Sequence, residues 1–279
     1  ALMAALKEEF ADHGVNLPIY WGNRNWQPYL ADTLAQMRES GITRAIAFFT
    51  SAFSSYSGCR QYRENIAAAQ EQVGAGAPQV DRLRMFFNHP GFIEPMVQRV
   101  ESALAQLPAQ RRAAAHLLFT AHSIPLAMAA NCQYEVQLRE ACSLVAAGAG
   151  HPAWRLVYQS RSGLPSQPWL EPDVSVALDE IAAGSGSRDV VVVPIGFISD
   201  HLEILYDLDD EAARHAQQLS LNFVRAATVG THPRFVRMIR ELVEERMSDS
   251  PVRLALGTLG PSHDVCPADC CRNEPRRTS

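Results

Sequence analysis

The sequence lacks a long hydrophobic run and, before its last few positions, any block of basic residues. No apolar stretch reaches the roughly 18 residues of a membrane-spanning helix, so we expect no transmembrane segment. The opening residues, ALMAALKEEFADHG, do not follow the charged, apolar and small-residue order of a signal peptide. A net charge of −5 and a pI near 6.0 exclude a nucleic-acid binder, which needs a basic face. We expect a cytoplasmic protein, at most peripheral to a membrane.

A periodic apolar pattern is also missing after Ser248, where serine, proline, aspartate and glycine dominate. Such a tail stays disordered unless something fixes it to the rest of the chain. Over all 279 residues, 47% are hydrophobic and 20% are charged, so the chain can bury a large core. Its length suits one large domain or two similar lobes, and the length alone does not choose between them.

Short β-rich runs alternate with longer helical patterns, as is typical of βα units around a parallel sheet. The predicted strands are 17–21, 45–49, 82–87, 115–120, 155–159, 189–194 and 222–226. The predicted helices are 27–40, 59–73, 91–106, 133–148, 173–184, 201–218 and 233–247. Because the alternation loosens near residues 108–112, we predict an α/β protein of two Rossmann-like lobes, 1–112 and 113–248, followed by a cysteine-containing extension, 249–279.

The chain opens on an amphipathic helical pattern rather than on a strand. Leu2, Leu6 and Phe10 share one face, and Glu8 and Asp12 share the other. An α/β lobe usually opens with a strand, so we expect the first lobe to be truncated, with its N-terminal strand missing.

Polar residues follow three of the predicted strands. They are the segments 50–59 (TSAFSSYSGC), 120–123 (TAHS) and 196–203 (GFISDHLE). Ligands of such folds bind at the carboxyl ends of the strands, so the three segments are expected to face one cleft.

An acidic series follows the third of these strand ends. Glu203, Asp207 and Glu211 recur every four residues on a predicted helix, so their carboxylates share one face. Like charges at this spacing repel, and they need either full solvation or a cation. A solvated helix face is the common explanation, but the position beside His201 at a strand end favours a route for a divalent cation with oxygen ligands.

His122 follows an apolar predicted strand directly, and Pro125 stops the chain soon afterwards. A neutral imidazole can accept a proton near pH 7 or bind a borderline metal such as iron. A structural histidine would be the usual explanation of an isolated case. The second histidine- and carboxylate-rich strand end favours a shared functional cleft.

These segments resemble the two signature stretches of the ferrochelatases. The likeness rests on TAHSIP at 120–125 and SDHLEILYD at 199–207, and it extends to YQSRSG at 158–163, PWLEPD at 168–173 and YWGNR at 20–24. It covers about residues 1–247. The resemblance implies a chelatase-like fold and a lyase that inserts Fe²⁺ into a porphyrin with release of two pyrrole protons.

The resemblance also implies roles for single residues. His122 matches the family's metal ligand or proton acceptor, and Glu203 matches the carboxylate that faces it. We expect these two side chains to confront each other across the gap between the lobes. Which of them takes the protons stays open.

Other residues near this pair match supporting positions of the family. Asp207 and Glu211 match outer acidic positions, which implies a relay for iron or for departing protons. Asp200 and His201 are expected to orient the inner pair. Local sequence also makes Asp200 or Ser199 a candidate N-cap of the helix.

The porphyrin contacts are less clearly marked. Aromatic faces for a macrocycle are offered by Tyr20, Trp26 and Trp169, each of which could equally be a core residue. Guanidinium groups for its propionates are offered by Arg24, Arg60 and Arg63.

Three of the six cysteines crowd together at Cys266, Cys270 and Cys271, and Cys59 follows a strand end. Four thiolates suit a two-iron cluster or a tetrahedral zinc ion. The resemblance favours a 2Fe-2S cluster, because one branch of the ferrochelatases holds such a cluster with one loop cysteine and three C-terminal ones. The other two, Cys132 and Cys142, are predicted to be buried as small hydrophobic residues.

We therefore predict a monomeric ferrochelatase that acts in heme biosynthesis. The cysteine pattern resembles that of the high-GC Gram-positive members, for which coproporphyrin III is the expected substrate. Three alternatives remain: a protoporphyrin IX ferrochelatase, a cobalt or nickel tetrapyrrole chelatase, and a non-catalytic heme- or metal-binding chaperone.

Overall fold

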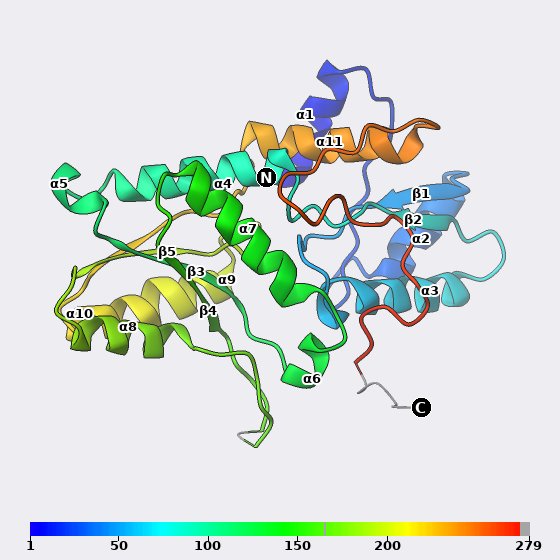
Figure 1. The fold of residues 1–279 in the computed structure, drawn as a ribbon. Coiled ribbons are helices and arrows are strands. Elements are labelled where there is room, and N and C mark those ends of the chain that lie inside the picture. Colours follow the sequence, from blue (N-terminus) through cyan, green and yellow to red (C-terminus); the bar gives the residue numbers. More distant parts are fainter. Residues whose placement is uncertain (165, 274–279) are drawn as a thin grey trace.

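A computed structural model describes residues 1–164 and 166–273 and confirms the predicted α/β class with parallel sheets. In the smaller sheet β1 (Arg44–Ala47) pairs with β2 (Gln79–Arg82). In the larger sheet the strand order is β4-β3-β5-β6, formed by β3 (His116–His122), β4 (Trp154–Gln159), β5 (Asp189–Val193) and β6 (Asn222–Arg225). Figure 1 shows the two sheets side by side, with helices packed over them.

Helices connect the strands in the order that the sequence predicts. Before β3 lie α1 (Leu2–Asp12), α2 (Leu30–Glu39), π-helical η1 (Tyr56–Arg60), α3 (Gln61–Val73), α4 (Pro90–Leu104) and α5 (Ala109–Arg112). After it come α6 (Leu126–Ala129), α7 (Tyr134–Gly148), α8 (Val174–Ala183), α9 (Leu202–Ile204), π-helical η2 (Leu205–Ala212), α10 (Ala213–Gln218) and α11 (Pro233–Met247). None of the described helices is both long and apolar enough to cross a bilayer.

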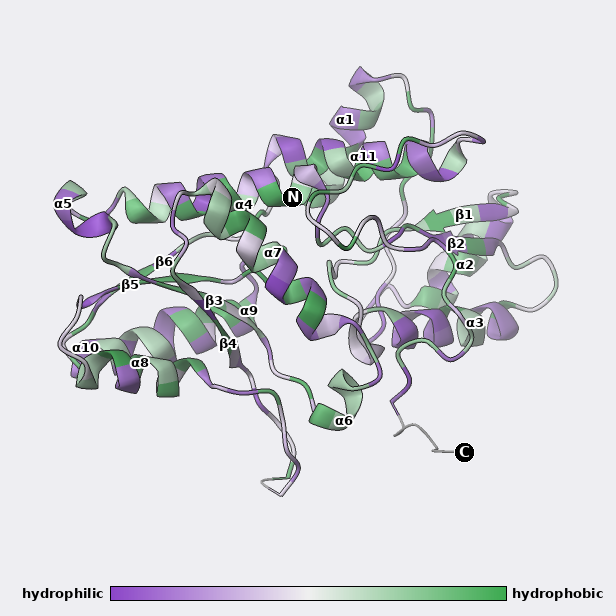
Figure 2. Ribbon diagram, viewed as in Figure 1, coloured by the Kyte–Doolittle hydropathy of each residue, from purple (hydrophilic) through white to green (hydrophobic). Residues whose placement is uncertain are grey.

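Strand β5 explains why the larger sheet has helices on both faces. Every residue of this strand is buried, as expected for a central strand of a parallel sheet. Because side chains alternate along a strand, Val190 and Val192 join the cluster formed with α8 and α10, whereas Val191 and Val193 join the cluster that contains α4 and α7. Figure 2 shows hydrophobic bands on the helices that cover this sheet.

An aromatic cluster connects the smaller sheet to α4 and α11. The Phe86 ring stacks on Phe48, with ring centroids 5.3 Å apart, and it meets the edges of Phe92 and Phe235 at 5.7 and 5.9 Å. Phe48 and Phe86 follow β1 and β2, and the other two rings come from the two helices. The core is therefore continuous between the two sheets. We propose that the lobes divide near residue 112, just before β3.

Two predicted strands are wrong. Residues 17–21 form no strand, and Pro18 offers no N–H for a sheet ladder there. The predicted strand 82–87 starts where β2 ends, so the ladder precedes the apolar run. Residues 83–87 are buried side chains of the core, and periodicity alone does not separate such a run from a buried strand.

A buried ion pair fixes the segment after β2 to α11. The Arg84 guanidinium donates to Glu245 Oε1 and Oε2 at 2.7 and 2.9 Å, and it also donates to the Leu254 carbonyl at 2.8 Å. Both charged side chains are buried. Such a pair is costly to break, because Glu245 then stays buried with only the longer contact from Arg253 at 3.3 Å.

We expect Arg84→Met to lower the free energy of unfolding by about 3 kcal/mol, since it strips Glu245 of its bidentate partner. Arg44→Met is the matched control, because the exposed Arg44 pairs with Asp81 and its loss is expected to cost about 1 kcal/mol or less. Urea unfolding followed by circular dichroism measures both values. Equal losses of unfolding free energy in the two variants would contradict the larger contribution expected of the buried pair.

Candidate active site

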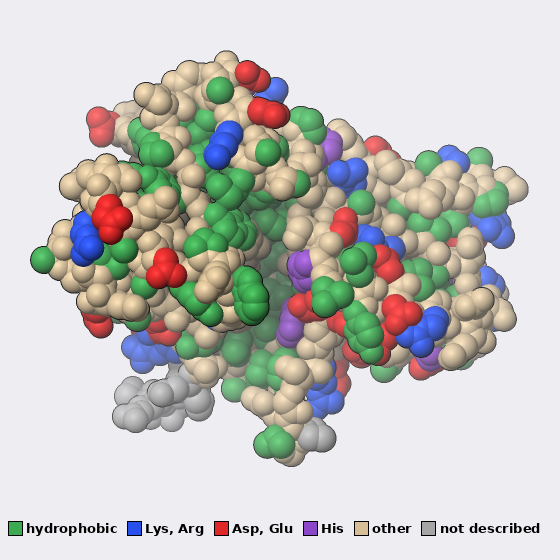
Figure 3. Space-filling view, turned by 180° about the vertical axis from the view of Figure 1, so that it is seen from behind, with side chains coloured by type: hydrophobic (Ala, Val, Ile, Leu, Met, Phe, Trp, Pro, Cys, Tyr) green, Lys and Arg blue, Asp and Glu red, His purple; other side chains and the backbone are tan. Residues whose placement is uncertain are grey.

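His122 and Glu203 lie together at the carboxyl edge of the larger sheet. His122 ends β3, Glu203 lies in α9 after β5, and the distance from His122 Nε2 to Glu203 Oε1 is 3.6 Å. Because β3 and β5 are parallel neighbours, their carboxyl ends meet at the same edge. The two side chains are 41% and 37% exposed, so the pair is open to a ligand. Figure 3 shows a hollow with a hydrophobic base and with histidine and acidic side chains along one wall.

A hydrogen bond of the His122 ring determines which ring nitrogen carries the hydrogen and which has a free lone pair towards Glu203. Nδ1 lies 2.5 Å from the carbonyl oxygen of Ser123, and a carbonyl only accepts, so Nδ1 carries the hydrogen. In the neutral ring Nε2 is then an acceptor, and Glu203 Oε1 is a buried acceptor without a hydrogen-bond partner. Two acceptors at this distance form a site for a proton or a cation.

A buried tyrosine holds the main chain of His122. The Tyr134 hydroxyl donates to the main-chain oxygen of His122 at 3.0 Å. Burial raises the pKa of Tyr134, so the phenol keeps its hydrogen and remains a donor. On the same helix Gln137 binds Ser54, so the segment 50–59 of the smaller sheet also reaches this region. Sequence reasoning missed Tyr134, because nothing in the local pattern separates it from a core aromatic residue.

The expectation that His122 and Glu203 face each other from different lobes is wrong. Both follow strands of the larger sheet and stand on the same wall. The reason is topological. The strands β3 and β5 are neighbours in the sheet, where His116 pairs with Val190, although residues 123–188 of the chain lie between them. A pair at one strand edge approaches its ligand from one side.

Asp207 is the next acidic residue from the pair, and the end of β4 holds it. Gln159 Nε2 donates to Asp207 Oδ2 at 3.2 Å, and the Ser160 hydroxyl donates to the same oxygen. Gln159 pairs with His122 in the sheet, so these residues occupy the same edge. Glu211 lies further along η2 and is exposed. The acidic series thus runs from solvent towards the His122 and Glu203 pair.

The acidic side chains of this segment fall into two groups. Asp209 binds Arg225 and Asp210 binds Arg214. In contrast, no ion pair joins the series Glu203, Asp207 and Glu211 to an arginine or lysine anywhere in the described chain. The charge of these three carboxylates is therefore free to attract a cation.

Asp200 and His201 do not contact the central pair as predicted. Asp200 accepts from Arg225 at 2.7 Å and from the Thr228 N–H at 3.4 Å, and the ring of His201 packs edge-on against Phe197. The predicted caps are also wrong, because His201 is the N-cap residue and makes no side-chain capping bond. The Asp200 carboxylate is instead held by an arginine from β6.

The predicted porphyrin contacts are spread over both halves of the molecule. Trp169 lies beside the segment after His122, through an antiparallel bridge to Pro125, and its buried indole N–H has no partner among the described residues. Arg24 binds Asn65 and the Ser57 carbonyl, and Tyr20 is half-buried nearby in the chain. Trp26 is 76% exposed and is not a core residue.

Arg60 is not available for propionates as predicted. Its guanidinium binds Glu64 and donates to the Ala268 and Cys270 carbonyls at 3.1 and 2.9 Å. It therefore fixes the C-terminal segment, whose position the sequence does not reveal.

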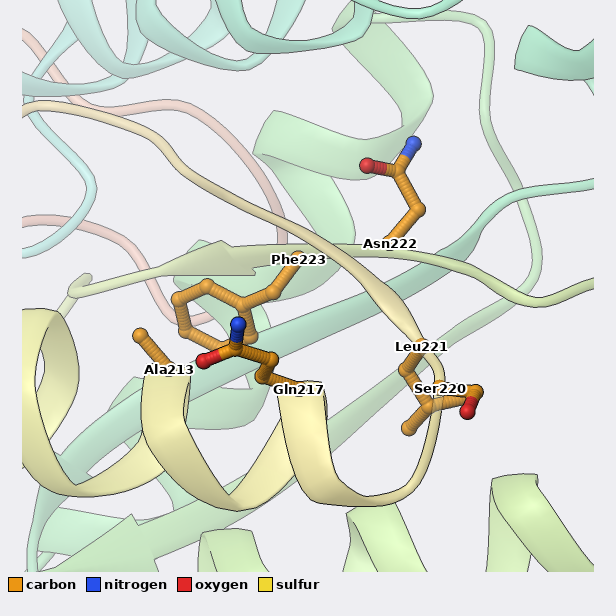
Figure 4. A pocket seen from close by; sticks show the side chains of 6 residues that line it. All are labelled: Ala213, Gln217, Ser220, Leu221, Asn222 and Phe223. Atoms are coloured by element: carbon orange, nitrogen blue, oxygen red, sulfur yellow. The ribbon is translucent and has the colours of Figure 1, made fainter.

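A shallow pocket of about 530 Å³ lies elsewhere. Its lining residues are Ala213, Gln217, Ser220, Leu221, Asn222 and Phe223 (Figure 4). Asn222 opens β6, so this pocket lies at the amino ends of the strands, opposite to His122. It offers no general base, nucleophile or metal ligand set.

The four predicted cysteines converge beside the smaller sheet. Cys59 Sγ lies 4.0 Å from Cys271 Sγ, which lies 3.4 Å from Cys270 Sγ. Cys266 and Cys270 have ligand atoms within 4.8 Å of one another and of His263. All of these cysteines are free thiols. Four sulfur atoms are the number that a two-iron cluster or a tetrahedral zinc ion takes, and His263 is a further donor beside Cys266 and Cys270.

The surroundings of Cys266 make its thiol unlike that of a free cysteine. The hydrogen bond with Cys59 and burial raise the pKa of Cys266 to about 12. Without a metal this thiol is protonated near neutral pH, and a bound metal would displace the proton.

The predicted extension reaches only partly into the described chain, because residues 274–279 lie outside the described residues.

A solved protein shares this fold. SirB from Bacillus subtilis, solved with Fe³⁺, matches with a TM-score of 0.55 over 88% of this chain and 89% of that one. At 13% identity this likeness shows the fold alone.

The chain belongs to the ferrochelatase family, whose members are lyases that insert iron into porphyrins. The family model "Ferrochelatase" matches residues 1–247. A "Ferrochelatase" of Rhodopirellula baltica is 57% identical over 99% of this chain and 78% of its own length. Proteins named "Coproporphyrin III ferrochelatase" are 50% identical in Streptomyces coelicolor, over 97% of this chain and 78% of the relative, and 52% identical in Frankia alni, over 100% and 74%. These matches confirm the family that the two signature stretches predict.

We expect Arg225→Met to lower kcat for iron insertion about ten- to a hundredfold and to leave KM for the porphyrin nearly unchanged. Arg225 binds Asp200 and Asp209 on either side of Glu203, so its loss displaces the carboxylate without touching the macrocycle. Arg214→Met is the control, since Arg214 is exposed and its ion pair among the described residues is with Asp210. A loss of activity as large in the control would refute a positioning role for Arg225.

Proposed function

We propose that this chain inserts Fe²⁺ into coproporphyrin III to give coproheme in heme biosynthesis, with His122 and Glu203 as the catalytic pair. The names of the relatives from Streptomyces coelicolor and Frankia alni support this substrate. The relative from Rhodopirellula baltica has the broader name, which leaves protoporphyrin IX as the alternative substrate.

The observation that carries this proposal is the acceptor pair. Insertion replaces two pyrrole N–H protons by one Fe²⁺ ion, so the site must hold a cation and accept two protons in the same place. His122 Nε2 and Glu203 Oε1 both present lone pairs, 3.6 Å apart. Either atom can bind the incoming iron or take a proton, and the other stabilises the charge of its neighbour.

The acidic series supplies a route for iron or for departing protons. Asp207 and Glu211 extend from the central pair towards solvent, and within the described chain neither forms an ion pair with an arginine or lysine. Oxygen ligands in this order lower the cost of stripping water from Fe²⁺ one step at a time, or they carry protons outward. Gln159 and Ser160 hold the middle carboxylate in position.

The macrocycle is proposed to lie along the hollow beside this wall. Trp169 offers an aromatic face and an unpartnered N–H next to the segment that follows His122. Tyr20 and Arg24 are proposed to contact it from the smaller sheet, where a guanidinium matches a propionate. Asp200 and His201 are proposed to act only through the loop that carries Glu203.

The cysteine site is proposed to hold a 2Fe-2S cluster through Cys59, Cys266, Cys270 and Cys271. Their converging free thiols and the likeness to the cluster-bearing branch of the family support this assignment. A bound cluster would supply a one-electron redox centre. Zinc is the alternative, because it takes the same number of thiolates.

We further propose a cytoplasmic monomer. Free thiols suit a reducing compartment, and both members of the catalytic pair come from one chain.

We expect His122→Ala to lower the rate of iron insertion by about 10²–10⁴-fold, because it removes a reacting group, while porphyrin binding persists. The assay mixes Fe²⁺ with coproporphyrin III anaerobically and follows the absorption bands, and fluorescence quenching measures binding. His116→Ala is the control, because His116 lies at the other end of β3.

Each other outcome selects an alternative. Faster turnover of protoporphyrin IX favours that substrate, and faster insertion of Co²⁺ or Ni²⁺ favours a different chelatase. Tight binding without turnover by the unaltered protein would indicate a chaperone. Full activity in His122→Ala would remove this residue from the mechanism.

We expect the anaerobically purified protein to be coloured, with visible absorption that is lost in Cys271→Ser. Cys142→Ser is the control, since Cys142 is buried in the core at α7 and lies outside the four-cysteine set. Metal analysis decides the ion. A colourless protein with one zinc ion per chain would replace the cluster by zinc and leave the iron-insertion proposal intact.

A further inference from the structure

A buried arginine without a carboxylate partner lies against the cysteine site. Arg82 ends β2 and is 8% exposed. Its Nη2 donates to Cys266 Sγ at 2.9 Å and to the His263 carbonyl at 3.0 Å. Its Nη1 donates to the Leu83 carbonyl at 3.4 Å. Within residues 1–164 and 166–273, no aspartate or glutamate forms an ion pair with Arg82.

A guanidinium in this position needs an anion. Arginine stays charged in proteins, and a buried charge is costly unless another charge or a set of hydrogen bonds compensates it. Arg82 Nε is buried and has no hydrogen-bond partner among the residues that the structure describes. The other buried arginine of the described chain, Arg84, is paired with Glu245. The group that can supply the missing negative charge is the sulfur of Cys266.

A second nitrogen reaches the same sulfur from the C-terminal segment, and it can donate to that sulfur once the thiol has lost its hydrogen. His263 Nε2 lies 3.3 Å from Cys266 Sγ. Arg82 holds the main chain of His263, so the positions of the two donors are linked. His263 is exposed, whereas Arg82 is buried, so the sulfur is contacted from the interior and from the solvent side.

We propose that Arg82 and His263 form a two-donor pair on Cys266 that stabilises the metal-loaded, anionic state of the cysteine site and raises the reduction potential of a cluster bound there. This inference rests on the proposed four-cysteine centre and extends it to two residues outside the ligand set. Both are positioning residues, because they act through the sulfur of Cys266.

The physical reason is the change of charge on reduction. One electron enters the cluster from an external reductant, no iron–sulfur bond breaks, and the centre becomes more negative. Hydrogen bonds to a ligand sulfur and a nearby positive charge both stabilise the more negative state. Removing either donor therefore favours the oxidised form.

The test uses the full chain with its cluster loaded anaerobically. Reduction by dithionite is titrated against redox mediators and followed by visible absorption and electron paramagnetic resonance. We expect a lower potential in Arg82→Met, a smaller decrease in His263→Ala, and a value between Arg82→Met and the unaltered protein in Arg82→Lys. Arg253→Met is the matched control, because it removes an equal charge that binds Ser262 and Asp264 in the same segment and Glu245 in α11, and contacts no cysteine of the described chain.

Unchanged potentials in both Arg82→Lys and His263→Ala overturn the proposal, and so does an equal shift in Arg253→Met. If Arg82→Met does not load its cluster, the other two variants still decide. If the protein holds zinc, the assignment of the cluster fails and the donor pair is tested by zinc release to a chelator. A several-fold faster release from Arg82→Met than from Arg253→Met then supports the pair, and equal rates reject it.

Discussion

Parallel alignment of β3, β4 and β5 is the constraint on which the candidate active site depends. Because parallel neighbours end at the same edge, His122, Gln159 and the loop that leads to Glu203 arrive together although they are far apart in the chain. Burial of β5 on both faces keeps this edge rigid. The two acceptor atoms of the central pair can therefore be held close without a hydrogen between them, which prepares the site for a proton or a cation.

The acidic side chains near this edge fall into two groups, those paired with an arginine and those without such a partner. Arg225 and Arg214 pair with the acids that fix η2, whereas no arginine or lysine of the described chain forms an ion pair with Glu203, Asp207 or Glu211. At the cysteine site the unpaired charge is positive. Arg82 has no carboxylate partner there, and the sulfur ligands are the anions that can compensate its charge. In both places an unpaired charge marks the position at which a ligand of opposite sign is expected.

Some features could be predicted from sequence because they depend on local pattern. The apolar β runs and amphipathic helices predict the α/β class, and the two signature stretches predict the family. Other features could not. Residues 17–21 have a strand-like pattern but Pro18 offers no ladder donor, and residues 83–87 are an apolar run buried in the core beyond β2. Asp200 looked like a cap or a support for the pair, yet its partner Arg225 lies 25 residues away on another strand.

The sequence by itself determined the composition of the sites: an imidazole and carboxylates after strand ends, and four thiols at two places in the chain. These depend on residue identity and on periods of two and of about four residues, which are local. Only the tertiary structure decided that His122 and Glu203 share one wall, that Tyr134, Gln159 and Ser160 support the site, and that Arg60 and Arg82 hold the C-terminal segment. The reason is that strand order and long-range hydrogen bonds depend on packing between distant segments, which no local pattern encodes.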